Sequence, residues 1–362
     1  MSTAVERLSE ALPQEINGVP VDAAMITSGK NLRYLTGFPS TSSVMLVTRE
    51  QSYFLTDFRY AEAAEKQITS CQVVMYTKLD ESIRQIISRH HIRGVLFEND
   101  KLSLGSAKKH ENILLSAGAT AIEDTALDTL IRDLRMIKSP EEIQKIKESQ
   151  KITDAAFQHV LPMIKVGAAE RNIALEIEFF MRKQGADGVA FDLIVVSGKN
   201  GSMCHGVPSS KKIEDGDFVT MDTGALLDGY HSDMTRTVAV GHVSEEQHTV
   251  YDTVLKAQLT ALAAVRPGIE CSTVDAAARD IIEKDFKGTF GHSTGHGVGV
   301  DIHEWPRFSS GDKTITKPGM VVTVEPGIYI PGKFGVRIED MVAVTETGCE
   351  NLTHSPKELI IL

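Results

Sequence analysis

The stretch MDTGALLDGYHSDMTRT, residues 221–237, predicts a β-hairpin that carries two carboxylates, Asp222 and Asp233. The run FVT directly before it is β-prone, and Asp228-Gly229 is a strong signal for a two-residue turn. The segment therefore predicts a strand, a tight turn and a second strand. This hairpin is the best-defined element of the sequence, and it decides the fold.

The register of the hairpin decides how its two aspartates meet. A two-residue turn makes the numbers of opposing residues sum to 457, which places Asp222 opposite Thr235 and diagonal to Asp233. A four-residue loop over 226–229 makes the sum 455 and sets the two aspartates directly opposite each other. Both alternatives put the carboxylates on one face, about 5 to 8 Å apart at Cβ. Two acidic residues on one face of a hairpin usually point into solvent, so this pair alone does not indicate a functional site.

A second hairpin with two carboxylates is predicted near the end of the chain. Glu325 lies in VVTVEPGIYI and Glu339 in GVRIEDMVAV, with proline and glycine residues between them. If residues 330–334 form the loop, the numbers of paired residues on the two strands sum to 664, which sets Glu325 across from Glu339. Between the hairpins, His296 and His303 lie in GHGVGVDIHEWP. Four carboxylates converging on buried sheets would be very costly without cations.

Two divalent ions would balance the four carboxylates, and one neutral imidazole would complete the set. A set of ligands rich in oxygen with one nitrogen favours Mn²⁺, with Co²⁺ and Zn²⁺ as alternatives, over a closed structural zinc site. Such a pair of ions, about 3.5 to 4 Å apart, would lower the pKa of a bridging water. The pattern therefore predicts a hydrolytic metal centre.

Length, charge and cysteine content limit the classes of function. At 362 residues the chain is long enough for two domains. A net charge of −11 disfavours nucleic acid and anionic membrane surfaces as partners. The cysteines are scattered, without the spacing of a thiolate metal site or redox pair. Glu6 and Glu10 interrupt any secretory signal and no long apolar run occurs, so we expect a cytoplasmic protein with no membrane segment.

The N-terminal part, residues 21–117, alternates apolar runs with helical stretches, which predicts a small α/β domain. It lacks both kinds of glycine-rich phosphate loop, so we expect no nucleotide site. From the residues alone, its clusters NLRYLTGF (31–38) and TDFRY (56–60) are interpreted as turns with core aromatics.

A second domain is predicted to follow, so that the N-terminal domain spans 1–122 and the second domain spans 123–362. Ser139 and Glu142 form a capping box with Pro140 at the first helical position, which opens a long helix. A second helix and strands follow, and the same order recurs about a hundred residues later. The fold class is therefore α/β (α+β), with two αα-then-ββ halves around one site.

Two other motifs lie near the hairpins, but neither has the surroundings that its usual function requires. GHSTG (291–295) matches the nucleophile elbow of serine hydrolases, but it lacks the preceding strand and following helix that the elbow needs. His303-Glu304 could begin the zinc-binding helix of a zincin, but Pro306 interrupts that helix. His231 and His292 lie close in sequence to candidate ligands, and His205 lies in a predicted turn just before the first hairpin. Each is compatible with a structural or a functional role.

These residues resemble the metallopeptidases of the pita-bread fold, which include aminopeptidase P, Xaa-Pro dipeptidase (prolidase), methionine aminopeptidase and creatinase. The resemblance covers nearly the whole chain and implies a creatinase-like N-terminal domain before a pita-bread catalytic domain. It implies a set of five ligands for two metal ions: Asp222, Asp233, His296, Glu325 and Glu339. It also implies that Glu325 transfers the proton during catalysis. The other residues that it implies for catalysis and substrate binding are His205, His303, Tyr329 and Arg337.

The motifs RIED (337–340) and EPGIY (325–329) resemble the proline-specific branch, as do NLRYLTGF and TDFRY. The resemblance thus implies removal of the N-terminal residue from short peptides with proline second, by an Xaa-Pro aminopeptidase or Xaa-Pro dipeptidase. Cys204-His205 is closer to methionine aminopeptidase, which makes that specificity the alternative. A binding module without activity is the least expected, because no ligand is replaced. The resemblance also implies a homodimer whose N-terminal domain walls off the partner's site.

Overall fold

The structure is a computed structural model that describes residues 3–362. The chain divides into two compact units, one ending at Arg135 and the other beginning at Met136. This division lies later than residue 122, where the sequence places it. The reason is helix α6 (Ala126–Met136), which is tied to the first unit. The hydroxyl of Tyr34 donates to the backbone oxygen of Leu134 at 3.0 Å, and Arg135 donates to Asn31 at 2.7 Å.

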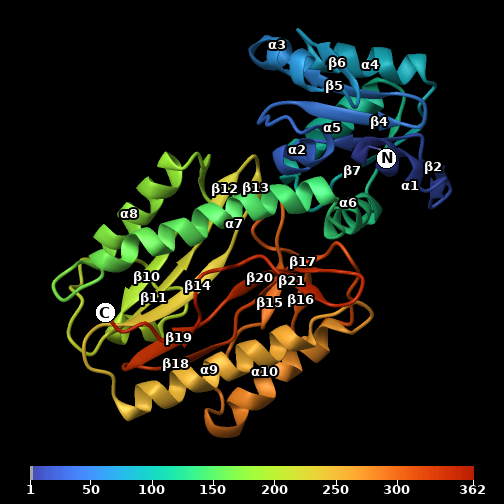
Figure 1. Ribbon diagram of the computed structural model, residues 1–362. Helices are drawn as coiled ribbons and strands as arrows, with labels where there is room; N and C mark the ends of the chain where they lie inside the picture. Colours follow the sequence, from blue (N-terminus) through green and yellow to red (C-terminus); the bar gives the residue numbers. More distant parts are fainter. Residues whose placement is uncertain (1–2) are drawn as a thin grey trace. The chain divides into compact units, whose positions relative to one another are not determined.

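The first unit is built on a six-stranded mixed sheet with strand order β6-β5-β4-β3-β7-β8. Its strands are β3 (Ala23–Ile26), β4 (Val44–Thr48), β5 (Ser52–Thr56), β6 (Gln72–Met75), β7 (Gly94–Phe97) and β8 (Thr120–Ile122), and a small hairpin, β1 (Glu15–Ile16) and β2 (Val19–Pro20), precedes them. Its helices besides α6 are α1 (Ala4–Ala11), α2 (Gly29–Thr36), α3 (Phe58–Gln67), α4 (Leu79–Arg89) and α5 (Leu104–Ser116). Strands β3, β4, β5 and β7 are buried at every residue, as in a sheet covered on both faces. The predicted α/β domain is confirmed (Figure 1).

Two local interpretations in this unit were wrong. Most of the cluster NLRYLTGF lies in helix α2, which ends at Gly37 with φ of 73°, a value that glycine adopts without strain. The cluster was interpreted as a turn because its polar residues resemble turn chemistry. Tyr34 and Phe38 are buried, as expected of core aromatics. In the second cluster, TDFRY, the same expectation was wrong, because Phe58 opens helix α3 and is 80% exposed.

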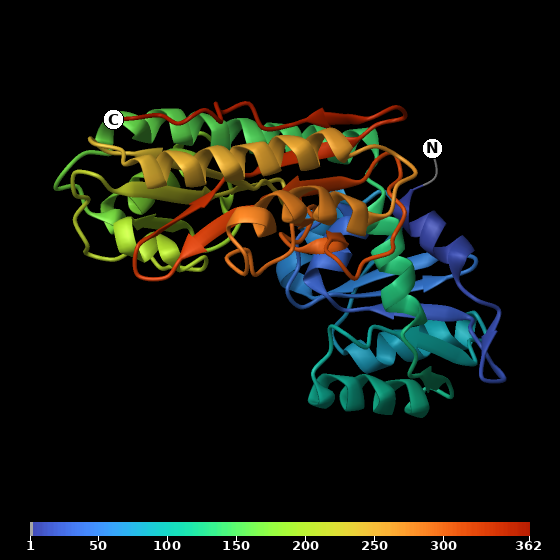
Figure 2. The same ribbon diagram turned by 90° about the horizontal axis from the view of Figure 1, so that it is seen from below.

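The second unit has two pairs of helices, each followed by strands, as the sequence predicts. The pairs are α7 (Pro140–Val160) with α8 (Glu170–Lys183), and α9 (Glu245–Ala264) with α10 (Cys271–Asp285). Figure 1 shows the strands between the two pairs, and Figure 2 shows α9 and α10 side by side. The predicted capping box opens α7, because Ser139 and Glu142 each accept a hydrogen bond from the other's backbone N–H. None of the helices within residues 3–362 is long and apolar enough to cross a bilayer.

The strands of this unit form four small sheets, in the orders β10-β11-β14, β13-β12-β9, β16-β15-β17-β20-β21 and β18-β19. In the first half they are β9 (Gly188–Val189), β10 (Ile194–Ser197), β11 (Phe218–Thr223), β12 (Ala225–Leu227), β13 (Tyr230–His231) and β14 (Met234–Ala239). In the second half they are β15 (Gly295–Gly297), β16 (Glu304–Phe308), β17 (Val321–Val324), β18 (Gly327–Ile330), β19 (Phe334–Arg337), β20 (Asp340–Val344) and β21 (Cys349–Asn351).

The first hairpin has the register of the two-residue turn. Asp222 on β11 pairs with Thr235 on β14, and farther along the chain Leu226 pairs with His231 in the same register. The turn residues Asp228 and Gly229 have φ of 48° and 79°, the paired positive values of a type I′ turn. The alternative four-residue loop is therefore excluded. The pairing between β11 and β14 thus continues in the same register between β12 and β13, which belong to a different sheet, and the change of sheet lies close to the aspartates.

The second hairpin also keeps the predicted register. Val324 pairs with Asp340 between β17 and β20, and Gly327 pairs with Arg337 between β18 and β19. The loop is shorter than predicted, because Ile330 and Phe334 still pair. Glu325 lies between β17 and β18, and Glu339 lies between β19 and β20, so both acidic residues stand where the hairpin changes sheet.

Candidate metal centre and cleft

The two hairpins and the segment after α10 meet at one cleft of the second unit, with a volume of about 460 Å³. The cleft is lined by all five predicted metal ligands and by three of the other predicted site residues: Asp222, Asp233, His296, Glu325, Glu339, His205, His303 and Arg337. Tyr329, the remaining predicted site residue, lies next to Arg337 and contacts it. Residues far apart in the sequence are therefore gathered as the spacing argument requires.

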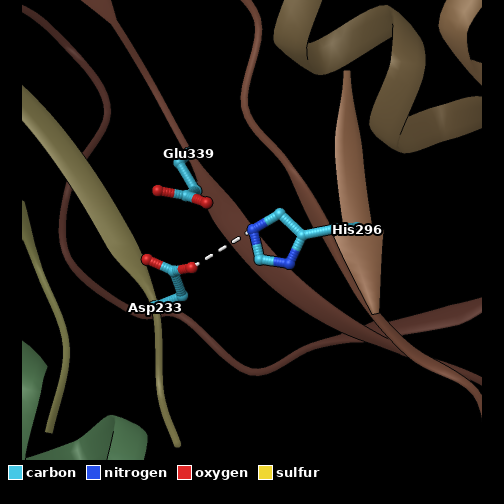
Figure 3. Close-up of side chains that lie close together, drawn as sticks. All are labelled: Asp233, His296 and Glu339. Carbon is cyan, nitrogen blue, oxygen red and sulfur yellow. Dashed lines mark ion pairs between the residues drawn. The ribbon is translucent and has the colours of Figure 1, made fainter. Parts of the chain in front are cut away.

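Three of the buried side chains could hold one ion (Figure 3). Asp233, His296 and Glu339 each offer a ligand atom, and these atoms lie within 4.8 Å of one another. Nε2 of His296 is 3.5 Å from an oxygen of Asp233 and 3.4 Å from an oxygen of Glu325. The histidine comes from β15, and each carboxylate comes from the point where a hairpin changes sheet.

The tautomer of His296 follows from its second ring nitrogen. Nδ1 lies 3.0 Å from the backbone oxygen of Gly297, which can only accept, so Nδ1 carries the proton. The lone pair of Nε2 is then directed at the carboxylates of Asp233 and Glu325. An imidazole held in this way is ready to bind a metal ion.

Asp222 shows the clearest sign that the cluster needs a cation. One oxygen, Oδ2, accepts a 2.6 Å hydrogen bond from Nη2 of Arg337. The other oxygen, Oδ1, is buried and has no hydrogen-bond partner within residues 3–362. A buried carboxylate oxygen without a partner is costly, and a bound cation would satisfy it. The residues present therefore fit divalent metal.

The charges of the cluster lead to the same conclusion. Burial raises the pKa of Glu325 to about 7, and burial together with neighbouring carboxylates holds the pKa of Asp233 and of Glu339 well above their usual values. Carboxylates in such surroundings carry full negative charge only when a cation is near. The cluster is electrostatically incomplete without one.

Arg337 connects the acidic residues to a wider network. Besides Asp222, it donates through Nε to the hydroxyl of Thr235 at 3.0 Å and through Nη1 to the hydroxyl of Tyr329 at 2.7 Å. The Tyr329 oxygen also lies 2.9 Å from Nε2 of His292. The guanidinium is thus occupied by protein groups, and Tyr329 acts on the cleft through Arg337 and His292. Sequence reasoning did not single out Thr235.

Two histidines of the cleft, His292 and His303, are kept neutral by burial. Burial lowers the pKa of His303 to about 4 and that of His292 to about 4. The rings of His303 and His296 meet edge to face, with centroids 4.5 Å apart. His231, which the sequence left open, has Nδ1 3.1 Å from the backbone oxygen of Gly299, outside the group that lines the cleft.

Arg307 on β16 adds a cation that sequence reasoning did not find. It lines the cleft, and its charge contributes to the lowered pKa of His303. Its backbone N–H donates to Asp312 at 2.8 Å, whereas its guanidinium has no hydrogen-bond acceptor within the described chain. The only sequence signal was its place four residues after His303 in the same strand region. Arg307 is available to an anionic group in the cleft.

Comparisons with known proteins agree with this geometry. Residues 144–346 match metallopeptidase family M24, and residues 7–137 match the Creatinase/Prolidase N-terminal domain. The chain is 38% identical over 358 residues to the Xaa-Pro dipeptidase of Pyrococcus furiosus, covering 98% of this chain and 99% of that protein.

Two solved structures are similar over almost the whole chain. An Xaa-Pro dipeptidase from Bacillus anthracis has a TM-score of 0.92 and 43% identity, with 99% of each chain covered. An X-Pro aminopeptidase from Thermotoga maritima MSB8 has a TM-score of 0.88 and 34% identity, with 94% of this chain and 98% of that chain covered. The predicted creatinase-like N-terminal domain and pita-bread domain are confirmed, and the chain belongs to metallopeptidase family M24.

Proposed function

We propose that this metallopeptidase removes the N-terminal residue from short peptides whose second residue is proline. The observation that carries the proposal is the convergence of four carboxylates and His296 on a cleft that also holds His205 and His303. The relatives named above support the choice of substrate, since they are Xaa-Pro dipeptidases and an X-Pro aminopeptidase.

The residues divide the chemical work between them. Asp222, Asp233, His296, Glu325 and Glu339 would hold two divalent ions, preferably Mn²⁺, which supply Lewis acidity and lower the pKa of water in the site. Glu325 would take a proton from water in the site and return it to the leaving nitrogen. His205 and His303 bind the scissile carbonyl, and the N–H of neutral His303 stabilises the negative charge that develops on its oxygen.

Arg307 favours dipeptides as substrates. A dipeptide of the Xaa-Pro type carries a free carboxylate next to the scissile bond, and a cation is needed to take that charge out of water. Arg307 lines the cleft with its guanidinium uncommitted, whereas Arg337 is occupied by Asp222, Thr235 and Tyr329. A longer peptide would present an amide at the same place and gain less from this cation.

The deciding experiment compares an Xaa-Pro dipeptide, an Xaa-Pro tripeptide and a Met-Ala tripeptide with Mn²⁺ supplied. The dipeptide is expected to have the highest kcat/KM, and chelation followed by dialysis should abolish its hydrolysis. Faster hydrolysis of the Met-Ala peptide than of both proline peptides would overturn the proposal in favour of a methionine-aminopeptidase specificity, the alternative that Cys204-His205 raised.

The proposal extends to a cytoplasmic homodimer. Phe58 and Met75 are 80% and 56% exposed on the first unit, which provides apolar surface for a second copy. The cysteines are unpaired, as expected in a reducing compartment. Light scattering at assay concentration should give twice the mass of one chain, and a fully active monomer would contradict the dimer.

A further inference from the structure

Thr235 on β14 lies between the two acidic hairpins and is completely buried. Its hydroxyl is 2.7 Å from Oε2 of Glu339 and 3.0 Å from Nε of Arg337. Its backbone oxygen accepts a 3.1 Å hydrogen bond from the backbone N–H of Glu339. A residue of the first hairpin thus holds both the backbone and the carboxylate of an acidic residue in the second.

The direction of these hydrogen bonds is unambiguous. Nε of Arg337 can only donate, so it occupies a lone pair of the Thr235 oxygen. The single hydroxyl proton is then given to Glu339, whose Oε2 is the acceptor. A hydrogen bond from a hydroxyl to a carboxylate is short and strong, and here it is enclosed on every side. The hydroxyl therefore sets the orientation of the Glu339 carboxyl group.

The same contact connects Glu339 with Asp222. Thr235 is the residue directly opposite Asp222 in the ladder of β11 and β14, and Arg337 donates to both. One arginine and one threonine therefore orient a carboxylate on each hairpin. Without the hydroxyl, Nε of Arg337 and Oε2 of Glu339 would each lose a buried partner.

We propose that Thr235 is a positioning residue of the metal centre, whose hydroxyl holds the carboxyl group of Glu339 toward Asp233 and His296. The inference rests on the proposed metal centre, and Thr235 itself binds neither ion nor substrate. Groups that orient a ligand in this way typically contribute a factor of about 10 to 100 in metal affinity. Loss of the hydroxyl should therefore weaken metal binding even where no substrate is present.

The test measures Mn²⁺ affinity by calorimetric titration of the metal-free protein. Thr235→Val keeps the shape of the side chain and removes the hydroxyl, and we expect it to weaken binding about 10- to 100-fold. Thr235→Ser keeps the hydroxyl and removes a methyl group, and it should stay within about threefold of the unsubstituted protein. Equal weakening by both variants would overturn the proposal, because the methyl group would then be responsible.

Thr220→Val is the matched control. Thr220 is buried on the neighbouring strand β11, and its hydroxyl contacts Thr237 and the backbone oxygen of Gly335, neither of which is a proposed ligand. It loses a buried hydroxyl as Thr235→Val does, so its Mn²⁺ affinity should stay unchanged. Equal weakening by Thr220→Val would show a general loss of packing and would also overturn the proposal.

Two further outcomes separate this inference from the proposed function. If the unsubstituted protein binds Mn²⁺ and Thr235→Val binds it equally well, Thr235 has no positioning role and the metal centre stands. If the unsubstituted protein binds no divalent ion, the proposed function fails and the inference fails with it. Thermal unfolding of each metal-free variant verifies folding, and Thr235→Ala replaces a valine variant that does not fold.

Discussion

Arg337 donates a 2.6 Å hydrogen bond to one oxygen of Asp222 and leaves the other oxygen buried without a partner in residues 3–362. Asp222→Asn removes the charge that would attract a cation and brings an amide against the same arginine. We expect a lower metal content and a lower kcat together, because ligand and charge are lost at once. Elemental analysis after dialysis is the measurement, and a metal content equal to that of the unsubstituted protein would contradict the assignment.

Glu325→Gln should keep the fold and reduce kcat by about a hundredfold or more, since the amide cannot carry the proton. Glu325 is also a proposed ligand, so metal content has to be measured in the same preparation. A fully loaded variant with low kcat assigns the loss to proton transfer. Full kcat in this variant would show that another group carries the proton.

The metal-free protein should lose stability as the pH rises from about 6.5 to about 8. Burial raises the pKa of Glu325 from 4.5 to about 7, and burial with neighbouring carboxylates also raises the pKa of Asp233 and of Glu339 well above their usual values. A carboxyl group with a raised pKa binds its proton more tightly in the folded chain, so its contribution is lost as the pH rises through that pKa. The pKa of His292 and of His303 is lowered from 6.5 to about 4, which has the opposite effect on stability, and this effect fades as the pH rises above 6.5.

Thermal unfolding of chelated protein at the two ends of this pH range checks the prediction. Tm should fall with rising pH, added Mn²⁺ should remove the decrease, and Glu325→Gln should reduce it. A Tm that rises with pH in the absence of metal would show that the carboxylates are not the dominant titrating groups.

Arg307→Met should lower kcat/KM for an Xaa-Pro dipeptide about tenfold or more, mainly through KM, because a hydrogen bond to a charged group contributes about 1.5 to 3 kcal/mol. Hydrolysis of the corresponding tripeptide should change much less. Arg307→Lys is the control, since it keeps the charge but not the planar fork of donors. Equal losses on both peptides would exclude recognition of the dipeptide carboxylate by Arg307.

The registers of both hairpins could be predicted because local residues determine them. Asp228 and Gly229 adopt the positive φ values that a two-residue turn demands, and this alone places Asp222 opposite Thr235. In the second hairpin the predicted loop was longer than the one found, yet the sum of opposing numbers was right. The pairing of residues across the strands is the same for both loop lengths, because both loops are centred on the same residue, Gly332.

The network around Arg337 could not be predicted in the same way. The contact between Thr235 and Glu339 joins residues 104 positions apart, and it depends on how one hairpin packs against the other. Nothing in the local pattern distinguishes Thr235 from Thr237, two residues along the same strand. Arg307 was missed for a similar reason, because only the folded cleft shows which cations lack an acceptor.

The tip of the second hairpin, residues 331–333, is exposed, and the pair Ile330 and Phe334 closes the ladder behind it. The side chain of Lys333 forms a solvent-exposed ion pair with Glu246, which contributes little to stability. Extra chain inserted at this tip would lengthen an open loop at a small entropic cost and leave the ladder that holds Glu325 and Glu339 undisturbed. The tip is thus a natural point for inserting an affinity tag or a reporter domain into the middle of the enzyme.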